Sequence, residues 1–345
     1  MLKTGINLLF INLLLFIYSN ETVNAQSKAP DWTRDPYRKY DKQLYIAAVG
    51  IGSSNQMAEK DALGKLVAIF GQSIQVDEEI TTSYQEAVSS GVVATWSEKT
   101  SVSSNISTST GMDSLIGVEI TDRWDNKRDF YAIAALNKRT ASTLYSDIIK
   151  ANQSTINNLI NISAIEKNTL EGYARYQLAA IIADITISYV NLLNVIGVQG
   201  GLYNTKPGND YRLEAQNIVK AIPINIAVTN DKSARIQGAF AKAFSELGFR
   251  SGGIASRYVL NVNVVISSTE HSANNIKYSR MELEANLTDT SAKAVLLPYN
   301  FNLREGHNTL SEAETRSFLT AERKINDEYK KLLSDYLSQL TLKNR

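Results

Sequence analysis

Three runs of alternating apolar and polar residues in the last third of the chain constrain its fold more than any other feature. Successive side chains of a strand point to opposite faces, so each run predicts a strand with one buried and one solvated side. The apolar members are Leu260, Val262, Val264 and Ile266, then Met281, Leu283, Ala285 and Leu287, then Val295, Leu297, Tyr299, Phe301 and Leu303. Together the runs predict a sheet whose apolar face needs a cover.

A long amphipathic helix after the third run is the predicted cover. Ser311 and Glu314 have the spacing of a capping box, and an apolar stripe follows from Phe318 to Leu340. We assign Tyr329 and Leu332 of this stripe to the core of the domain, not to an interface.

The residues upstream of the three runs complete this domain. Residues 222–228 form an apolar run typical of a strand, and Asn230 or Asp231 is placed to cap a helix that Gly248 ends. The order β-α-β-β-β-α predicts an α+β domain over residues 210–345, with both helices on one side of the sheet. Residues 197–209 are rich in glycine and predict a linker.

Two apolar stripes with helical spacing occupy the middle of the chain. One runs from Leu144 to Ile160 and the other from Leu170 to Ile196, with an asparagine-rich bend between them. This pattern predicts a helical hairpin over residues 146–196.

The pattern before residue 146 predicts a compact α+β domain over residues 26–145. A strand from Tyr45 to Gly50 precedes a helix that Ser53 and Gln56 cap and Gly71 closes. Residues 115–136 predict a hairpin that turns at Asp125-Asn126, with Val118, Ile120 and Trp124 alternating with polar residues. Residues 74–110 are rich in serine and threonine, and their alternation predicts extended strands with one wet face. Trp32, in the irregular lead-in, is expected to pack onto this domain.

The first 25 residues have the composition of a cleavable signal peptide. Lys3 precedes an apolar run from Leu8 to Tyr18, and Val23-Asn24-Ala25 suits a cleavage site, so the mature chain is predicted to begin at Gln26. An uncleaved N-terminal anchor is the alternative interpretation. We expect no later stretch to span a membrane, because Asp184 interrupts the most apolar one.

The residue inventory argues against the common catalytic and metal sites. The chain has no cysteine and only two histidines, His271 and His307, which are far apart in sequence. No zinc-hydrolase spacing and no serine nucleophile elbow is present. The formal charge of +1 gives no reason to expect nucleic-acid binding. We therefore predict no catalytic residues, no cofactor and no bound metal.

Two further motifs each allow a functional and a structural interpretation. Residues 50–55, Gly-Ile-Gly-Ser-Ser-Asn, lie where a phosphate could bind at the start of a helix, but a tight turn needs the same residues. Asp77-Glu78-Glu79 could contribute to a cation site, and a solvated strand edge is the favoured interpretation.

The first domain resembles the LPP20 lipoprotein family of bacterial envelope proteins. The residues that carry the resemblance are Pro30-Asp31-Trp32, residues 45–53, Ala58, Ala62, Leu66, and the run from Phe130 to Leu136. It covers about residues 30–145 and implies an LPP20-like helix-plus-antiparallel-sheet domain in a non-catalytic envelope protein. Lipoprotein members of the family need a cysteine at the signal cleavage site, and because this chain has none we expect no lipid anchor.

These observations predict an exported, non-catalytic structural or interaction protein that is part of an envelope or outer-membrane-associated assembly, with other envelope proteins as partners. The expected location is the periplasm, and association with the outer membrane or secretion are the alternatives. The alternative is a periplasmic module that binds a glycan or small ligand, with some of the 17 tyrosines forming a platform in the interdomain cleft. A hydrolase with an unrecognised site ranks last. The candidate partner surface is the polar stretch with Ser103, Asn105 and Thr108, which is either a solvated hairpin or an edge that docks a partner by strand addition.

Overall fold

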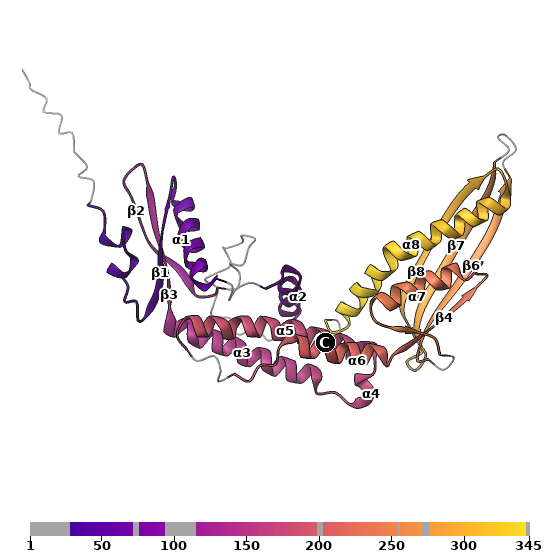
Figure 1. The fold of residues 1–345 in the computed structure, drawn as a ribbon, viewed down its shortest axis with the longest axis horizontal. Coiled ribbons are helices and arrows are strands. Elements are labelled where there is room, and N and C mark those ends of the chain that lie inside the picture. The colour runs from indigo at the N-terminus through magenta and orange to yellow at the C-terminus, as the bar shows by residue number, and fades with distance from the viewer. Residues whose placement is uncertain are drawn as a thin grey trace, which may run out of the picture.

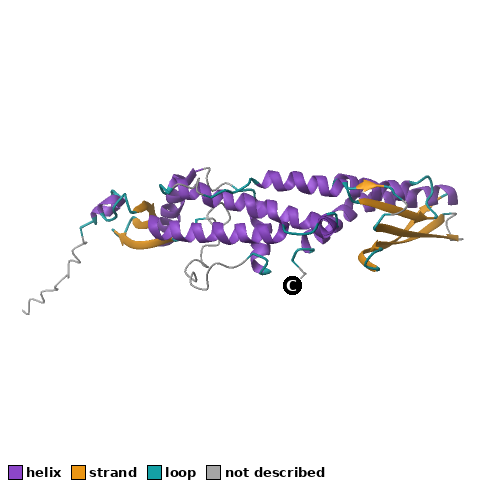
Figure 2. Ribbon diagram, turned by 90° about the horizontal axis from the view of Figure 1, so that it is seen from below, coloured by secondary structure: helices purple, strands orange, loops and turns teal. Residues whose placement is uncertain are grey.

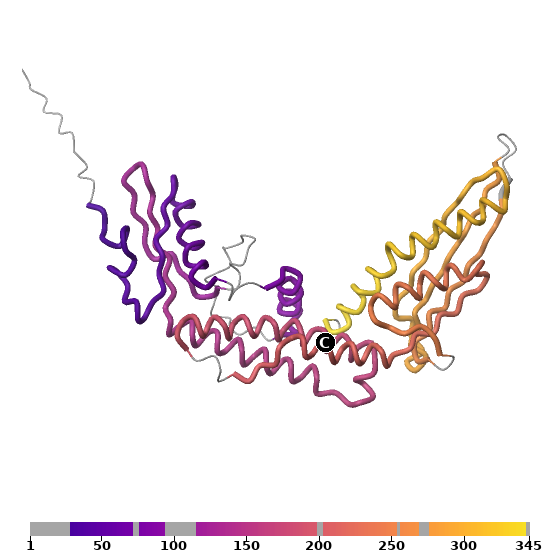
Figure 3. The backbone as a smooth tube through the Cα atoms, in the orientation of Figure 1, coloured from indigo at the N-terminus to yellow at the C-terminus, as the bar shows by residue number. Residues whose placement is uncertain are grey.

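The chain forms two sheet-containing arms that rise from a layer of helices (Figure 1). The computed structural model describes residues 28–71, 76–93, 115–198, 203–253, 256–270 and 276–342. In the tube view the N-terminal arm and the C-terminal arm stand at opposite ends of the helical layer, so the outline is an open V (Figure 3). The α+β class predicted from the sequence is confirmed.

The N-terminal arm is a three-stranded antiparallel sheet covered by one helix. Its strands are β1 (Tyr45–Gly52), β2 (Val118–Asp125) and β3 (Phe130–Asn137), in the order β1-β3-β2. Helix α1 (Asn55–Phe70) lies on one face and buries Ala58, Ala62, Leu66 and Phe70, as its spacing predicted.

The glycines at the end of β1 serve this helix packing. A Cβ on Gly50 would lie 2.0 Å from the carbonyl oxygen of Ala58, and one on Gly52 would lie 2.6 Å from the Ala58 nitrogen. Only glycine therefore allows the helix backbone to approach the strand so closely. The cap of α1 is Ser54, one residue after the predicted Ser53, and Gly71 closes the helix with a positive φ of 49°.

The second face of this sheet is covered by the lead-in segment. Two 3-10 turns, η1 (Asp31–Thr33) and η2 (Pro36–Arg38), pack against it, and Trp32 is only 6% exposed. The expectation that Trp32 packs onto the first domain is confirmed.

A β-bulge in β2 changes the predicted alternation. The register shifts between Ile120 and Asp122, so Trp124 points to the face opposite Val118 and Ile120. The ion pairs agree, because Asp122 contacts Lys39 beside η2 whereas Arg123 contacts Glu59 on α1. The interpretation that placed all three apolar residues on one face was wrong, since sequence alternation does not reveal an inserted residue.

The prediction of strands across residues 74–110 is wrong where the structure describes them. Helix α2 (Glu78–Ser89) occupies this segment, and Asp77 caps it by accepting a hydrogen bond from the Glu79 amide. Glu78 and Glu79 lie in its first turn, where acidic side chains favour a helix. The acidic run is thus a helix start and not a strand edge. Ser103, Asn105 and Thr108 lie outside the described residues, as do the proposed signal peptide and His271.

The helical layer consists of α3 (Lys138–Ile160), the short α4 (Ala164–Lys167), α5 (Leu170–Val195) and α6 (Gly208–Lys220). Figure 2 shows the long helices running along the length of the molecule between the two arms. The bend predicted between the two stripes is confirmed at residues 161–169. Helix α6 was not predicted; it begins inside the segment interpreted as a linker.

Of the helices in the described ranges, α5 alone has the length and apolar composition of a membrane span, contrary to our expectation from Asp184. The helix is apolar on most of its sides, and 61% of its most apolar 18-residue stretch is buried inside the protein. Its flanks pack on α3, α2 and α6. Asp184 is used inside the protein, where it accepts hydrogen bonds from the Gly208 amide and from Arg212.

The C-terminal arm is a five-stranded sheet with two helices on one face. Its elements are β4 (Pro223–Thr229), α7 (Arg235–Glu246), β5 (Arg250–Ser251), β6 (Tyr258–Glu270), β7 (Lys277–Asp289), β8 (Ala294–His307) and α8 (Leu310–Gln339). The strand order is β5-β4-β6-β7-β8, with β4 parallel to β6 and the last three strands antiparallel. Both helices cover the apolar face, as predicted.

Three details of this arm differ from the predictions. A register shift between Leu287 and Thr288 turns Val295 outward, and it is 58% exposed. Helix α8 is capped by Thr309, not Ser311. Tyr329 is fully buried as assigned, whereas Leu332 is only partly buried and its neighbour Leu333 fills the core.

Candidate functional site

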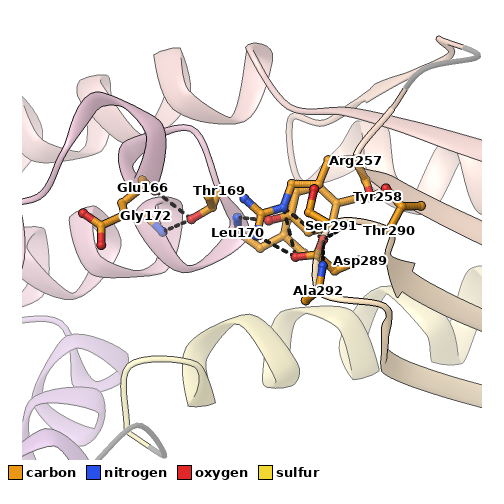
Figure 4. A network of polar contacts seen from close by, with 10 residues as sticks. All are labelled: Glu166, Thr169, Leu170, Gly172, Arg257, Tyr258, Asp289, Thr290, Ser291 and Ala292. Carbon is orange, nitrogen blue, oxygen red and sulfur yellow. Dashed lines mark hydrogen bonds and ion pairs between the residues drawn. The ribbon is translucent and has the colours of Figure 1, made fainter.

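The junction between the helical layer and the C-terminal arm holds a polar network that joins segments far apart in the sequence. The turn from α4 into α5, the start of β6, the β7–β8 turn and the end of α8 meet there, around a cavity of about 240 Å³. Figure 4 shows this network, in which Arg257 and Asp289 face each other and Tyr258 reaches the start of α5. We call it the joint.

Asp289 is the anchor of the joint. It is 5% exposed and accepts hydrogen bonds from Arg257 Nε at 2.9 Å and Nη2 at 2.7 Å, and from the amide of Ser291 at 2.9 Å. Burial acts to raise the pKa of Asp289, but the hydrogen bonds from Arg257 and from the turn amides outweigh it and hold the pKa below its usual value. The carboxylate therefore ties the β7–β8 turn to the start of β6.

Tyr258 extends this network into the helical layer. Its hydroxyl accepts a hydrogen bond of 3.2 Å from the Leu170 amide, one of the free amides at the start of α5. The guanidinium of Arg257 lies 5.3 Å from the Tyr258 ring centre. Burial raises the pKa of Tyr258, so the hydroxyl stays neutral near pH 7.

Thr169 completes the start of α5. Its hydroxyl accepts from the Gly172 amide at 3.0 Å and donates to the Glu166 carbonyl at 2.7 Å. A Cβ on Gly172 would lie 2.3 Å from the Lys167 carbonyl oxygen, so the α4–α5 turn needs glycine at this point. The local sequence therefore fixes the direction in which α5 meets the C-terminal arm.

The contacts of the joint indicate a structural role, because its main polar groups form hydrogen bonds and ion pairs with one another. Arg257 is paired with Asp289, Arg175 with Glu171 at 2.8 Å, and Tyr258 with the α5 amide. Tyr258 is 3% exposed, so its ring offers no open stacking surface for a sugar.

A second cavity lies where the end of α8 meets α5 and α2. It measures about 300 Å³ and is lined by Tyr173, Leu178, Ile181, Leu247 and Leu337 among others. The end of α8 thus lies against the helical layer and faces α2 of the N-terminal half.

Candidate chemical groups elsewhere are sparse. Within the described ranges no three His, Cys, Asp or Glu side chains are grouped as metal ligands. His307 lies at the end of β8, where its Nδ1 accepts from the Thr309 amide at 3.5 Å.

The sequence analysis missed the joint residues. Arg257 and Asp289 are 32 positions apart in the sequence. Each lies at the end of a strand, where charged residues are common, so neither indicates a site by itself. The only sequence signal is that Arg257 directly precedes one predicted strand and Asp289 ends the next.

Comparison with known proteins agrees with the resemblance described above. Residues 30–137 match the model of the LPP20 lipoprotein family, which confirms the resemblance for the N-terminal arm. No curated protein matches the sequence.

Several solved structures match this chain at low sequence identity and with TM-scores below 0.5. The secreted protein HP1454 from Helicobacter pylori is 13% identical, with 87% of this chain and 99% of that chain covered at a TM-score of 0.43. A putative lipoprotein from Caulobacter crescentus is 12% identical, with 32% and 90% covered and a TM-score of 0.26. A minor lipoprotein from Acinetobacter baumannii is 13% identical, with 36% and 91% covered and a TM-score of 0.25. The family match associates the N-terminal arm with exported envelope proteins.

Proposed function

We propose that this protein is an exported, non-catalytic component of the cell envelope whose helical layer holds two α+β arms at a fixed spacing for other envelope proteins. The observation that carries the proposal is that each arm shares its hydrophobic core with the helical layer. An arm connected only by a flexible linker would have a core of its own.

The N-terminal arm is continuous with the helices. β3 ends at Asn137 and α3 begins at the next residue, so no linker separates them. Ile46 and Leu66 of the arm belong to the same buried cluster as Tyr145 of α3 and Leu192 of α5.

The C-terminal arm is attached in the same way from the other end of α5. Leu170 and Tyr173 of α5 and Ile218 of α6 share a buried cluster with Phe244 and Leu260 of the arm. The joint adds a hydrogen-bonded connection beside this cluster. Helix α5 is therefore a common spine, with the two arms packed on its opposite ends.

The alternative function is binding of a small ligand at the junction, for which the two cavities are the supporting observation. Their volumes of about 240 and 300 Å³ are at or below the lower end of the usual range of ligand pockets, roughly 300–1,000 Å³. The scaffold function accounts for the shared cores, which a ligand site does not require.

A distance measurement between the arms tests the scaffold function. The chain has no cysteine, so Ser53→Cys near the tip of one arm and Ser267→Cys on the other give two defined spin-label positions. We expect a narrow distance distribution by pulsed electron paramagnetic resonance. Adding Arg257→Met should broaden it, whereas Arg323→Met, which changes an exposed arginine on α8 of the same arm, should not. A broad distribution in the otherwise unchanged protein would refute a fixed spacing.

Location in the envelope is tested separately. We expect protein from the native host to fractionate with the envelope and to begin at Gln26. Intact Met1–Ala25 on cytoplasmic protein would exclude export.

A further inference from the structure

The edges of the two sheets are unequally protected, and this inequality identifies an interaction surface. An edge strand exposes unpaired backbone groups that can pair with another strand, and proteins usually block them. On β1 the block is visible. The Ile51 amide donates to Asp61 Oδ2 at 2.8 Å, Lys65 Nζ donates to the Val49 carbonyl at 3.2 Å, and the two side chains pair at 2.7 Å.

Two other edges carry structural protection. β2 contains the bulge at residue 121, which disrupts the regular edge. β5 has only two residues and is followed by Gly252 and Gly253, both at positive φ. A partner strand would find little regular backbone on either edge.

β8 is the long edge of the C-terminal sheet and is open over most of its length. It spans 14 residues and, among the strands in the described ranges, pairs only with β7. Within the described part of the chain, no side chain forms a hydrogen bond with the β8 backbone. Its irregular features, the register shift near Leu296 and Pro298, lie towards its start, which leaves Tyr299–Arg304 regular and uncovered.

Pro298 indicates which backbone groups face outward. A proline within a sheet directs its nitrogen away from the neighbouring strand, because it cannot contribute to the ladder. Residues two apart in a strand present their backbone groups to the same side. The amide and carbonyl groups of Asn300 and Asn302 therefore point to solvent, and those of Tyr299 and Phe301 bond to β7.

We infer that β8 pairs antiparallel with β8 of a second copy of this chain, about a two-fold axis at Asn300. A strand that adds to this edge must place apolar residues on the side of the sheet covered by α8 and polar residues on the exposed side. β8 has this pattern, with Tyr299, Phe301 and Leu303 on the helix side and Asn300, Asn302 and Arg304 on the other. In a two-fold interface the same surface of both copies is in contact, so that surface must be complementary to itself. The alternating pattern of β8 meets this requirement.

Side chains near the edge favour the axis at Asn300. In this register Phe301 lies opposite Tyr299 of the second copy, which gives two aromatic cross-strand pairs. Lys324 lies over the Phe301 ring, and Glu328 accepts from the Tyr299 hydroxyl at 3.0 Å. Lys324 and Glu328 already form an ion pair within one copy. This register brings Lys324 of each copy nearest to Glu328 of the other, so opposite charges alternate across the interface. An axis at Asn302 would instead place Glu328 beside Glu305 of the second copy, where like charges repel.

The backbone completes the pairing. The two Asn300 residues exchange both of their amide-to-carbonyl bonds across the axis, and the Asn302 amide of each copy donates to the Pro298 carbonyl of the other. The result is a continuous sheet across two C-terminal arms. This inference is independent of the scaffold function, which concerns the arms within one copy.

Single cysteines in this cysteine-free chain test the inference. With the axis at Asn300, the two Asn300 Cα atoms lie about 5.5 Å apart, inside the range of about 4.4–6.8 Å that a disulfide accepts. The two Asn302 Cα atoms are offset by four residues, roughly 13 Å along the strands, and cannot be bridged. Asn263→Cys, on the interior strand β6 of the same exposed face, is the matched control.

We expect Asn300→Cys to give on the order of tenfold more disulfide-linked dimer than Asn302→Cys or Asn263→Cys under mild oxidation, because pairing raises the local thiol concentration. The unchanged protein should show concentration-dependent doubling of mass in sedimentation. Equal crosslinking at all three positions together with a monomer at every concentration would overturn the inference. Preferential crosslinking at Asn302 would overturn the register, and capture of a different envelope protein by Asn300→Cys in cells would overturn the second copy as the occupant.

Discussion

Truncation of Leu333 is the most direct test of how α8 holds the molecule together. Leu333 is fully buried between α8 and the C-terminal sheet, whereas the adjacent Leu332 is only partly buried. Leu333→Ala removes roughly three buried methylene equivalents, which at about 0.8 kcal/mol each gives about 2.4 kcal/mol. The cavity left in the core adds to this, so we expect a loss of about 3–4 kcal/mol in the free energy of unfolding.

Leu332→Ala is the matched control, because it makes the same chemical change one residue away. Its side chain keeps solvent contact in the folded protein, so we expect a loss of about 1 kcal/mol. Urea titration followed by far-ultraviolet circular dichroism gives both values, with the slope unchanged if the unfolded state is unaffected.

Tryptophan fluorescence shows whether the two arms unfold together. All three tryptophans lie at or before residue 124, so their signal reports the N-terminal half. Because both arms share their cores with α5, Leu333→Ala should shift the fluorescence transition together with the dichroism transition. A loss below 1 kcal/mol would refute the assignment of Leu333 to the core. A fluorescence transition that stays in place while the dichroism transition moves would refute the common spine.

Three further predictions concern single groups. The pKa of Asp289 is lowered in the folded state, so its contribution to stability is present above about pH 3.9, the pKa of an unperturbed aspartate. This contribution is lost as the pH falls through the folded pKa. Asp289→Asn should therefore lower the melting temperature near pH 7 and flatten the acid side of the plot of melting temperature against pH. Gly50→Ala should destabilise by more than about 2 kcal/mol because its Cβ meets the backbone of α1, whereas Gly64→Ala, with nothing within 4 Å, should stabilise by about 0.5–1 kcal/mol in the same denaturation assay. Tyr329→Phe should be neutral or stabilising because the buried Tyr329 hydroxyl has no hydrogen-bond partner among the residues that the structure describes, whereas Tyr145→Phe should cost about 1 kcal/mol by removing a 2.9 Å bond to the Ile116 carbonyl.

The joint and the β8 edge show why a site of this kind is hard to predict. Arg257 and Asp289 carry no motif, and their meeting depends on the antiparallel register of β6 and β7. The open edge depends on strand order, which places β8 outside β7 with no other strand of the described residues beyond it. The candidate surface at Ser103, Asn105 and Thr108, by contrast, was chosen on local composition alone and stays a prediction.

Periodicity by itself determined the α+β class and most of the elements. The alternation in β6, β7 and β8 and the stripe of α8 were readable because burial on one face imposes a regular spacing on the sequence. The same physics made Ala58, Ala62 and Leu66 recognisable as one face of α1.

Tertiary structure alone decided the features that depend on distant partners. The helix over residues 78–89 is not one of these features, because Ile80, Tyr84, Ala87 and Val88 already have helical spacing, which the surrounding serine and threonine content obscured. What the structure adds is the packing of Ala87 into the helical layer and the 2.9 Å hydrogen bond between the Tyr84 hydroxyl and Asn152 of α3. The bulges that turn Trp124 and Val295 are invisible in sequence, because one inserted residue exchanges the faces without changing composition. The choice of Leu333 over Leu332 follows from how α8 lies on the sheet. In a regular element the spacing shows which residues share a face, whereas only the packed structure shows where a bulge exchanges the faces and which residue at the margin of a face is buried.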